Sequence, residues 1–328
     1  MRLLPLFFTL MRARRRARTA LFIAALCGSG AAVGSSTTLA VMALNALGAG
    51  SIVKAAQAQG LVPATPPKSS IAVSGNEPWH AQASAGSFDA CREQFAQGRQ
   101  PRLQGLDSRT ASGLRPLCFD GFAVMYSSQH KTPLYVAQVL DRQRLAAAKQ
   151  QQRSDQFFED ARLPRAARAT LEDYRGSGFD RGHMAPAGDM GDERSMAQSF
   201  SLANIVPQAR EHNRKPWADV EKATRSYVLR ASGPVYVITG VVHEAGQCPI
   251  AAQPQPPRTF DAQACTIGAG KVAVPSHMFK LVFDPQRNRA WAHWLPNRDD
   301  ARVSPPIAYA ELVRRTGIDF LPGFDGQP

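Results

Sequence analysis

The sequence predicts an α+β protein in which helices flank a central, mostly antiparallel sheet. Stretches rich in β-branched and aromatic side chains, which are typical of strands, fall in the early and late thirds of the chain, around residues 116–140 and 235–295. Patterns typical of helices lie mostly between these regions. Because strands and helices do not alternate regularly, the order of elements disfavours a parallel α/β sheet. A chain of 328 residues is long enough for one large domain or two small ones.

The N-terminal region, residues 1–58, has the composition of a leader. Residues 1–18 are rich in arginine, two apolar runs follow at 19–34 and 38–53, and Ala56-Gln57-Ala58 matches a small-x-small cleavage pattern. This order is typical of a signal peptide and predicts export to the periplasm or the medium. Two alternatives stay open: an uncleaved membrane anchor, and a mitochondrial transit peptide if the source is eukaryotic, since such peptides are also rich in arginine and poor in acids.

The region after the leader divides into a linker and a folded domain. Residues 59–88 are rich in Pro, Ala, Ser and Gly and predict a linker, so we place one domain at residues 89–322. The net charge of the chain is +13, but residues 1–68 contain eight basic residues and no acid, and removing these eight leaves +5. The folded part is therefore mildly basic, which suits a nucleic-acid partner without proving one.

Four of the five cysteines lie in the predicted domain: Cys91, Cys118, Cys248 and Cys265. None of them has the Cys-x-x-Cys or Cys/His spacing of a zinc site. In an exported protein we expect the disulfides Cys91–Cys118 and Cys248–Cys265, because each closes a short local loop. The alternative is four reduced thiols in the core.

The first half of the domain is expected to begin with a short helix at Phe88–Gln97. Alternating apolar and polar side chains then predict a β-hairpin within residues 116–140, with its turn at Ser127–Thr132. Residues 142–166 are strongly charged and poor in apolar side chains, which predicts an exposed loop or a short helix. A short helix at Ala167–Tyr174 follows.

In the second half, Val235–Val242 is a continuous apolar, β-branched run and predicts a buried strand. The remaining expectations are helices at Glu193–Phe200, at Pro216–Ala231 with Pro216 in the first turn, and at Pro305–Thr316, strands at Lys271–Phe283 and Ala290–Leu295, and a proline-containing loop at 246–269. Gly268 and Gly270 form a lone glycine pair without the rest of a phosphate-binding loop, so nucleotide binding is not predicted.

The chemistry centres on the stretch from Gly178 to Pro186, whose core is Asp180-Arg181-Gly182-His183. We expect it on a strand and the loop that leaves this strand. The guanidinium of Arg181 suits a phosphate group, and the ordinary pKa of a histidine such as His183 lies close to neutral, as a general base requires. Taken alone, the motif is also compatible with a surface turn that contains a structural histidine.

A second segment favours the functional interpretation. It runs from Asn204-Ile205-Val206-Pro207-Gln208 to Asn213, Trp217 and Glu221. Asn213 offers a neutral amide oxygen, a ligand that suits a hard cation such as Mg²⁺. Glu221 lies eight residues further along a predicted helix, a little over two turns, which places the two side chains on roughly the same side.

Together these motifs resemble the DNA/RNA non-specific endonucleases, the family of mitochondrial endonuclease G and the secreted bacterial sugar-non-specific nucleases. The resemblance rests on Tyr-Arg-Gly-Ser-Gly-Phe-Asp-Arg-Gly-His at 174–183, Ser-Leu-Ala-Asn-Ile-Val-Pro-Gln at 201–208, and Asn213-x-x-x-Trp217-x-x-x-Glu221. It covers most of residues 90–320 and implies a ββα-metal (His-Me finger) nuclease fold. It also implies that Asn213 binds one Mg²⁺, or alternatively Mn²⁺, and that Glu221 orients the water around this ion.

The resemblance implies further roles. His183 is the expected general base, and Arg181 is expected to stabilise charge in the transition state. Asp180 is expected to hold Arg181 or the loop, and Asn204 to fix the hairpin or contact the metal. The family also has an essential arginine ahead of the motif, for which Arg153 is our candidate.

The alignment around Arg153 is loose. Arg142, Arg144 and Arg162 are therefore alternatives for the same role. For each of these arginines, a solvated charge run is an equally good interpretation.

The expected activity is hydrolysis of phosphodiester bonds in DNA and RNA with little base preference, because a site that binds only phosphate and a metal distinguishes bases and sugars weakly. Two alternatives stay open: a phosphodiesterase of the same fold that acts on another phosphate ester, and a nucleic-acid-binding protein without activity. A homodimer is also left open. Contact with a membrane is expected only through residues 1–58, if these are not cleaved.

Overall fold

A computed structural model describes residues 87–103, 112–244, 246–249 and 259–326. The predicted leader and almost all of the predicted linker lie outside the described residues. Phe88, at the end of the predicted linker, is already buried and its ring lies 4.9 Å from that of Phe95, so the packed structure includes it.

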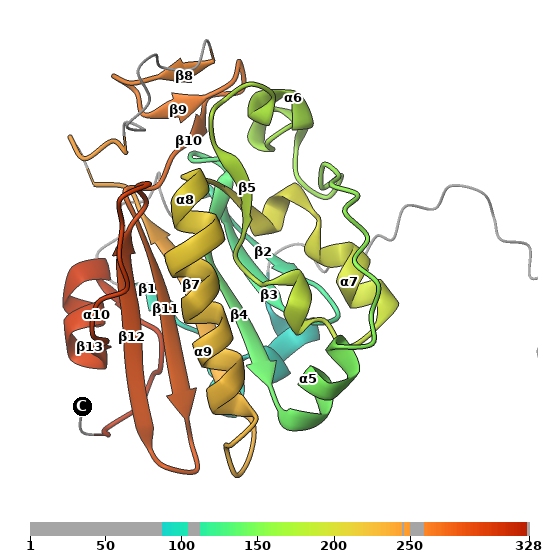
Figure 1. Cartoon of the computed structure of the whole chain (residues 1–328), viewed down its shortest axis with the longest axis vertical. Coiled ribbons are helices and arrows are strands. Elements are labelled where there is room, and N and C mark those ends of the chain that lie inside the picture. Colours follow the sequence, from blue (N-terminus) through green and yellow to red (C-terminus); the bar gives the residue numbers. More distant parts are fainter. Residues whose placement is uncertain (1–86, 104–111, 245, 250–258, 327–328) are drawn as a thin grey trace, which may run out of the picture. The chain divides into compact units, whose positions relative to one another are not determined.

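The centre of the fold is one antiparallel sheet of seven strands. These are β2 (Leu114–Cys118), β3 (Ala123–Ser127), β4 (Thr132–Leu140), β7 (Val235–Val242), β11 (His277–Asp284), β12 (Arg289–Pro296) and β13 (Ile307–Ala308). They lie in the order β13-β12-β11-β7-β4-β3-β2 (Figure 1). The predicted antiparallel α+β class is confirmed, as are the hairpin with its turn between Ser127 and Thr132 and the buried strand at Val235–Val242.

Helices surround this sheet. They are α5 (Arg142–Ala148), α6 (Leu171–Tyr174), α7 (Glu193–Ser199), α8 (Arg210–His212), α9 (Ala218–Val228) and α10 (Tyr309–Thr316). Short 3₁₀ turns are η1 (Asp89–Gln94), η2 (Ala96–Gly98), η3 (Arg165–Ala167), η4 (Ala187–Asp189) and η5 (Leu202–Asn204). In Figure 1, α8 and α9 run along one face of the sheet, and α10 lies beside β12 and β13.

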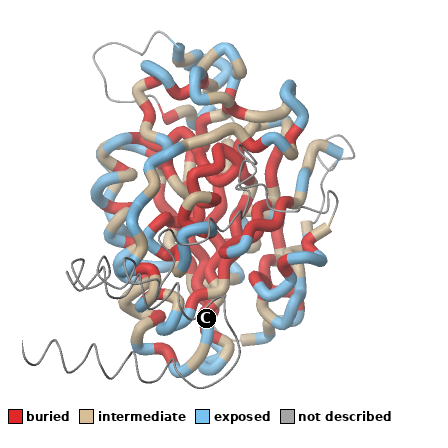
Figure 2. Tube along the Cα trace, turned by 90° about the vertical axis from the view of Figure 1, so that its right-hand side faces the viewer, coloured by how far each residue is buried: buried red, intermediate tan, exposed pale blue. Residues whose placement is uncertain are grey.

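Both faces of the sheet are buried, and side chains of β11 alternate between them. Met278 packs with Trp217 and Val220 of the helix that covers one face. Phe279 and Leu281 belong to a second cluster on the opposite face. Figure 2 shows buried segments through the middle of the domain and exposed segments around it. The sheet thus provides a rigid base for the helix that contains the predicted metal ligand.

The predicted helix at Pro216–Ala231 is wrong at its start. Helical structure already begins at Arg210, and Pro216 lies inside a π-helical turn, Asn213–Trp217, between α8 and α9. Proline lacks the N–H that would bond the carbonyl four residues earlier, here that of His212. A π turn, which bonds five residues apart, accommodates this loss without ending the helix.

Two other boundaries also differ from the sequence prediction. The predicted strand Lys271–Phe283 is divided, because Pro275 separates β10 (Val272–Ala273) from β11. The predicted helix Pro305–Thr316 begins only at Tyr309, after the short edge strand β13.

A small sheet made of β8 (Phe260–Asp261), β9 (Thr266–Ile267) and β10 extends from the end of β7. The disulfide Cys248–Cys265 lies in this region, and Cys91–Cys118 joins the N-terminal 3₁₀ turn to β2. Both predicted disulfides are therefore present. A short two-stranded pair of β1 (Arg102–Leu103) and β14 (Ile318–Asp319) completes the described strands outside the site.

Within the described part of the chain, no helix combines the length and apolar character needed to cross a bilayer.

Candidate active site

The predicted organising stretch forms β5 (Asp180–His183), which pairs antiparallel with β6 (Ile205–Gln208). Gly182 faces the side chain of Gln208: a Cβ on this glycine would lie 2.0 Å from Gln208 Oε1. Only glycine allows the two strands to pair with Gln208 in this position. Arg181 and His183 are two residues apart on β5 and therefore lie on the same face of the strand, where Arg181 is exposed and His183 is partly buried.

Asn204 fixes the loop that follows β5. Its Oδ1 accepts a hydrogen bond from the Ala185 backbone N–H at 2.9 Å, and its Nδ2 donates to the carbonyls of Ala185 and Ser199 at 2.9 Å each. The side chain is fully buried. These bonds hold the loop after β5 in place, which is one of the two roles expected of Asn204, and its contact with a metal stays a prediction.

The helix after β6 contains Asn213 and Glu221. In a straight α-helix, a separation of eight residues overshoots two full turns by about 80°. The π turn at Asn213–Trp217 takes in one more residue per turn, which reduces this angle. The irregularity at Pro216 therefore brings the two side chains closer to one side of the helix.

Asp180 connects β5 to this helix. Its carboxylate accepts a hydrogen bond of 3.1 Å from Asn213 Nδ2 and two bonds, of 3.0 and 3.1 Å, from the Arg214 guanidinium. Arg210 lies 3.9 Å away. The expected contact with Arg181 is not what the structure shows: Arg181 instead lies across the ring of Phe157, 4.2 Å from its centre. Asp180 thus positions Asn213 rather than its own sequence neighbour.

His183 lies between two aromatic rings. Its imidazole is 4.9 Å from the ring of Phe200 and 5.5 Å from that of Phe157, and its Nε2 is buried without a hydrogen-bond partner among the described residues. Burial lowers the pKa of His183 to about 3, and the nearby positive charges of Arg153 and Arg181 act in the same direction, against Asp155. The imidazole is therefore neutral at pH 7 and able to accept a proton.

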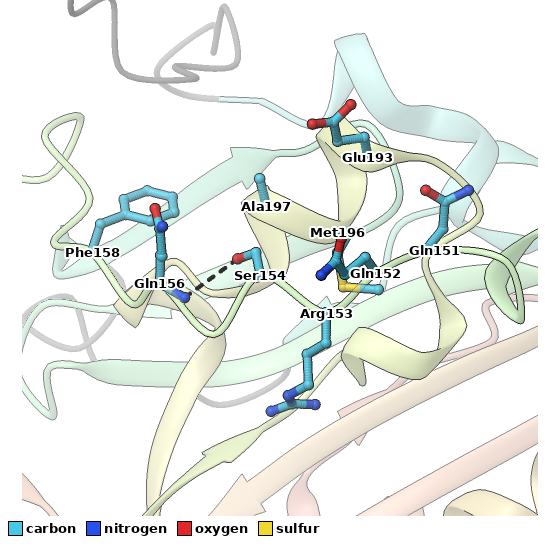
Figure 3. Close-up of a pocket in the computed structure, with 9 residues that line it drawn as sticks. All are labelled: Gln151, Gln152, Arg153, Ser154, Gln156, Phe158, Glu193, Met196 and Ala197. Carbon is cyan, nitrogen blue, oxygen red and sulfur yellow. Dashed lines mark hydrogen bonds between the residues drawn. The ribbon is translucent and has the colours of Figure 1, made fainter. Parts of the chain in front are cut away.

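Of the four candidate arginines, Arg153 is the one whose charge acts on His183. Its guanidinium lies 5.0 Å from the centre of the Phe200 ring and 2.5 Å from the carboxylate of Asp155, and about half of its side chain is exposed. Figure 3 shows Arg153 pointing away from Gln156 and Glu193, which line the same hollow. The exposed half of the Arg153 side chain is thus accessible to a ligand, although Asp155 already pairs with its guanidinium.

The other three arginines are held elsewhere by a carboxylate or by backbone carbonyls. Arg162 forms a buried ion pair with Asp160 at 2.6 Å. Arg144 donates to the carbonyls of Val139, Asp189 and Gly121. Arg142 lies 3.4 Å from the Ala231 carbonyl. We therefore retain Arg153 as the candidate.

Glu221 lies in a buried group of charges. Arg225 is 3.9 Å from its carboxylate and also forms an ion pair of 3.0 Å with Asp189, which is buried. Burial raises the pKa of Glu221 to about 7 and the charge of Asp189 acts in the same direction, whereas Lys280, Arg225 and Arg153 lower it. A carboxyl group with a pKa near neutral is typical of functional sites.

Two hollows lie next to these residues. One, of about 630 Å³, is lined by polar side chains of the 151–156 loop, including Arg153, and by α7 (Figure 3). The other, of about 370 Å³, is lined by Tyr174, Arg175, Phe179 and Arg181, among others. The site is therefore open to a large ligand on both sides, and arginines line both hollows.

Comparison with known proteins agrees with this geometry. The family model described as DNA/RNA non-specific endonuclease matches residues 105–327. The chain belongs to this family. Its relatives include mitochondrial nuclease EXOG of Danio rerio, 30% identical over 240 residues, and mitochondrial endonuclease G of Homo sapiens, 34% identical over 169 residues. The alignments cover 69% and 50% of this chain but only 66% and 52% of these relatives, less than two thirds of their length.

A solved structure of EndoG in complex with its inhibitor EndoGI has the same fold. It matches with a TM-score of 0.52 and 24% identity, over 62% of this chain and 84% of that one. The expected ββα-metal fold is therefore confirmed: β5 and β6 are the two strands, and the helical segment from Arg210 to Val228 follows them.

The nuclease family implies a divalent metal, and the residues of this chain fit one. The Asn213 amide nitrogen is used by Asp180, so its oxygen is the atom left for a cation. Amide oxygens suit hard cations. Among the described residues, no group of three or more His, Cys, Asp or Glu side chains is arranged to hold a metal. A cation held by one amide oxygen would keep most of its water, as Mg²⁺ commonly does.

Several residues of this candidate site did not enter the sequence prediction. Arg225 follows Glu221 by four residues on the same helix face, a spacing that can indicate an interacting pair. Lys280 is the single charged residue between apolar neighbours in β11, which is an unusual pattern for a buried strand. Asp189 and Phe200 had no such signal, because only the fold brings them to the site.

Proposed function

We propose that this chain is a metal-dependent endonuclease that hydrolyses phosphodiester bonds in DNA and RNA with little base preference. The observation that carries the proposal is the joint placement of the candidate base, the phosphate-binding arginine and the candidate metal ligand on one ββα unit. His183 and Arg181 are on β5, and Asp180 of the same strand holds Asn213 on the helix. Membership of the nuclease family and the arginines around both hollows support the same conclusion.

In the proposed reaction, His183 takes a proton from water at Nδ1, because its Nε2 is buried. The resulting hydroxide attacks the phosphorus, the opposite P–O ester bond breaks, and the leaving sugar oxygen takes up a proton from water. Arg153 and Arg181 stabilise the negative charge that develops on the phosphate oxygens. A pKa of about 3 makes His183 a weak base in the free protein, and the negative charge of a bound phosphate would raise this pKa toward neutral.

Asn213 would hold the divalent cation, Mg²⁺ or Mn²⁺, through its amide oxygen. When bound, such a cation supplies Lewis-acid stabilisation of charge on the phosphate and the leaving oxygen. Glu221, in its ionised form, would orient water at this side of the helix. Contacts limited to phosphate and cation explain why little base preference is expected.

The test is digestion of plasmid DNA, structured RNA and a small phosphodiester by the full chain. Each substrate is incubated with Mg²⁺, with Mn²⁺ and with EDTA. The protein is compared with His183→Ala and, as a matched control, with His130→Ala, a histidine in the turn between β3 and β4. We expect cleavage of both polymers that EDTA and His183→Ala abolish and His130→Ala retains.

Three other outcomes would contradict the proposal. Cleavage that survives His183→Ala or EDTA would place the reaction elsewhere. Cleavage of the small diester alone would indicate a phosphodiesterase for another ester. Binding of DNA without cleavage by the unchanged protein would indicate a nucleic-acid-binding protein.

We further propose that the chain acts outside the cytosol. The two disulfides and the basic, apolar residues 1–58 support export to the periplasm or the medium. The mitochondrial names of the relatives support the alternative of a mitochondrial protein. Mass spectrometry of the N-terminus of the mature protein would show whether residues 1–58 are removed.

A further inference from the structure

Lys280 is a buried lysine beneath the helix of the candidate site. It lies in the middle of β11, only 1% exposed, on the sheet face that the helix covers. Its Nζ donates a hydrogen bond of 2.5 Å to Thr239 Oγ1 on the adjacent strand β7 and lies 5.3 Å from the centre of the Trp217 ring. These contacts direct the ammonium toward the helix.

The position of Lys280 is energetically unfavourable for a structural residue. In the part of the chain that the structure describes, no carboxylate lies within 4.0 Å of its Nζ, so it forms no direct ion pair. A buried charge without a direct partner costs free energy, and an apolar side chain of similar volume usually stabilises a core at least as well. The fold itself therefore gives no reason for a lysine at this position.

The side chains above Lys280 belong to the proposed site. Trp217, Glu221 and Arg225 follow each other at intervals of four residues, which places them along one face of the helix. Lys280 contacts the first of them, and its charge acts on the second. Glu221 thus lies 3.9 Å from Arg225 and one helical turn beyond Trp217, the residue that Lys280 contacts.

We propose that Lys280 is a positioning residue for Glu221: its buried ammonium, held by Thr239 and Trp217 beneath the helix, attracts the Glu221 carboxylate and orients it in the site. This inference rests on the proposed nuclease function, which gives Glu221 its role. Neither the family match nor the motifs of the sequence assign a function to Lys280.

The charges around the pair favour this interpretation. Glu221 is faced by Lys280 from β11, by Asp189 from the loop after β5, by Arg225 from α9 and by Arg153 from the 151–156 loop. Lys280 is faced by Glu221, Asp189 and Arg225, and it lies opposite His293 of β12. Burial lowers the pKa of Lys280 and raises that of Glu221, and each group's charge opposes the shift of the other.

The test compares Lys280→Met with two other variants of the full-length protein. Thr239→Val removes the hydroxyl that Lys280 contacts but keeps the ammonium. Val282→Ala, a buried residue on the same face of β11, opens a cavity without changing any charge. For each variant we measure thermal unfolding, the pH dependence of plasmid cleavage and, in the metal-free protein, the titration of Glu221 by ¹³C NMR. The resonance is assigned with Glu221→Gln.

We expect Lys280→Met to unfold at the same or a higher temperature than the unchanged protein. The pKa of Glu221 should rise by about one unit, which corresponds to about a tenfold loss of cleavage at pH below this pKa. The acidic limb of the pH profile should shift to higher pH by the same amount as the pKa of Glu221. Cleavage should recover at pH values above the shifted limb. Thr239→Val should show a smaller shift in the same direction, and Val282→Ala a lower unfolding temperature with no shift.

The proposal would be overturned by a Lys280→Met protein whose Glu221 titration and pH profile match those of the unchanged protein. It would also be overturned if the variant resembled Val282→Ala, with a loss of activity that follows the loss of stability. If Lys280→Met does not fold, an unshifted titration in Thr239→Val overturns it. Because the NMR titration needs neither metal nor substrate, it separates failure of this inference from failure of the proposed nuclease activity.

Discussion

Asp180 and Asn213 are joined by a hydrogen bond of 3.1 Å in which the Asn213 amide nitrogen donates to the Asp180 carboxylate. The bond orients the amide group, so that its oxygen is directed away from Asp180. The same carboxylate also binds Arg214, which ties the start of the helix to β5. The strand β5 and the helix that contains Asn213, the proposed metal ligand, are therefore coupled through one residue.

The first prediction concerns this coupling. Asp180→Ala removes the partner that orients Asn213, and loss of such a supporting contact typically lowers metal affinity by about 10- to 100-fold. Calorimetric titration with Mn²⁺ should show this decrease. Asp219→Ala, which removes an exposed acid on α9, is the control and should bind as the unchanged protein does. Equal affinities for Asp180→Ala and the control would exclude the orienting role.

The second prediction separates Arg153 from Arg162. Arg153 is half exposed, so Arg153→Ala should keep the unfolding temperature and lower cleavage by about 10²-fold or more, as expected for loss of a charge-stabilising group. Arg162 pairs with Asp160, which is 3% exposed, and Arg162→Ala should cost about 3–5 kcal/mol of unfolding free energy.

Urea unfolding and plasmid cleavage of both variants check this prediction. The prediction would be contradicted by the reverse pattern, in which Arg153→Ala loses stability and Arg162→Ala loses activity alone. Arg153 would then be the wrong candidate for the arginine of the site. Arg162, one of the four arginines considered from the sequence, would be the better candidate.

The sequence predicted the parts of this protein that depend on local chemistry. The hairpin around Ser127–Thr132, the strand Val235–Val242 and both disulfides follow from alternation, β-branched runs and short loop closures. The motif from Asp180 to His183 is local in the same sense, because all its functional groups lie on one strand.

The sequence did not predict contacts that the tertiary fold creates. The partner of Asp180 is 33 residues away, at Asn213, and not its neighbour Arg181. Lys280 and Glu221 approach only because β11 lies beneath α9. Likewise, only the folded structure explains why residues 268 and 270 are glycines. The Asp173 carboxylate packs against the backbone of both and accepts a hydrogen bond of 2.6 Å from Gly270 N–H.

The third prediction concerns Gly182. A methyl group at this position would lie 2.0 Å from Gln208 Oε1 and 2.6 Å from Gln208 Cβ, so the strands must separate or Gln208 must move. Gly182→Ala should destabilise the protein by about 1–3 kcal/mol, as overpacking does, and lower cleavage because His183 follows directly. Gly188→Ala is the control, since its methyl group would make only an ordinary contact of 3.7 Å with Arg225. Equal unfolding temperatures for both variants would contradict the prediction.

The fourth prediction is that buried histidines make the protein less stable in acid. Burial lowers the pKa of His183 and His243 to about 3, with the neighbouring His130 adding to the effect at His243, and burial lowers that of His212 to about 4. The unfolded chain binds protons at these histidines near pH 6.5, whereas the folded protein does not. The unfolding free energy should therefore fall as pH decreases from about 6.5 toward 4, by up to about 1.4 kcal/mol per pH unit for each histidine, and the raised pKa of Glu221 offsets the effect of about one histidine between pH 7 and 4.5.

His243 allows this prediction to be tested away from the candidate site. Its ring stacks on that of His130 at 4.2 Å, and its Nε2 is buried without a partner among the described residues. His243→Phe keeps an aromatic ring there but removes the proton-binding group, so its unfolding free energy should fall less steeply below pH 6.5. Urea unfolding of both proteins between pH 4.5 and 8.5 gives the two slopes. Parallel curves would mean that His243 binds its proton equally well in the folded and unfolded chain, and that other groups cause the loss in acid.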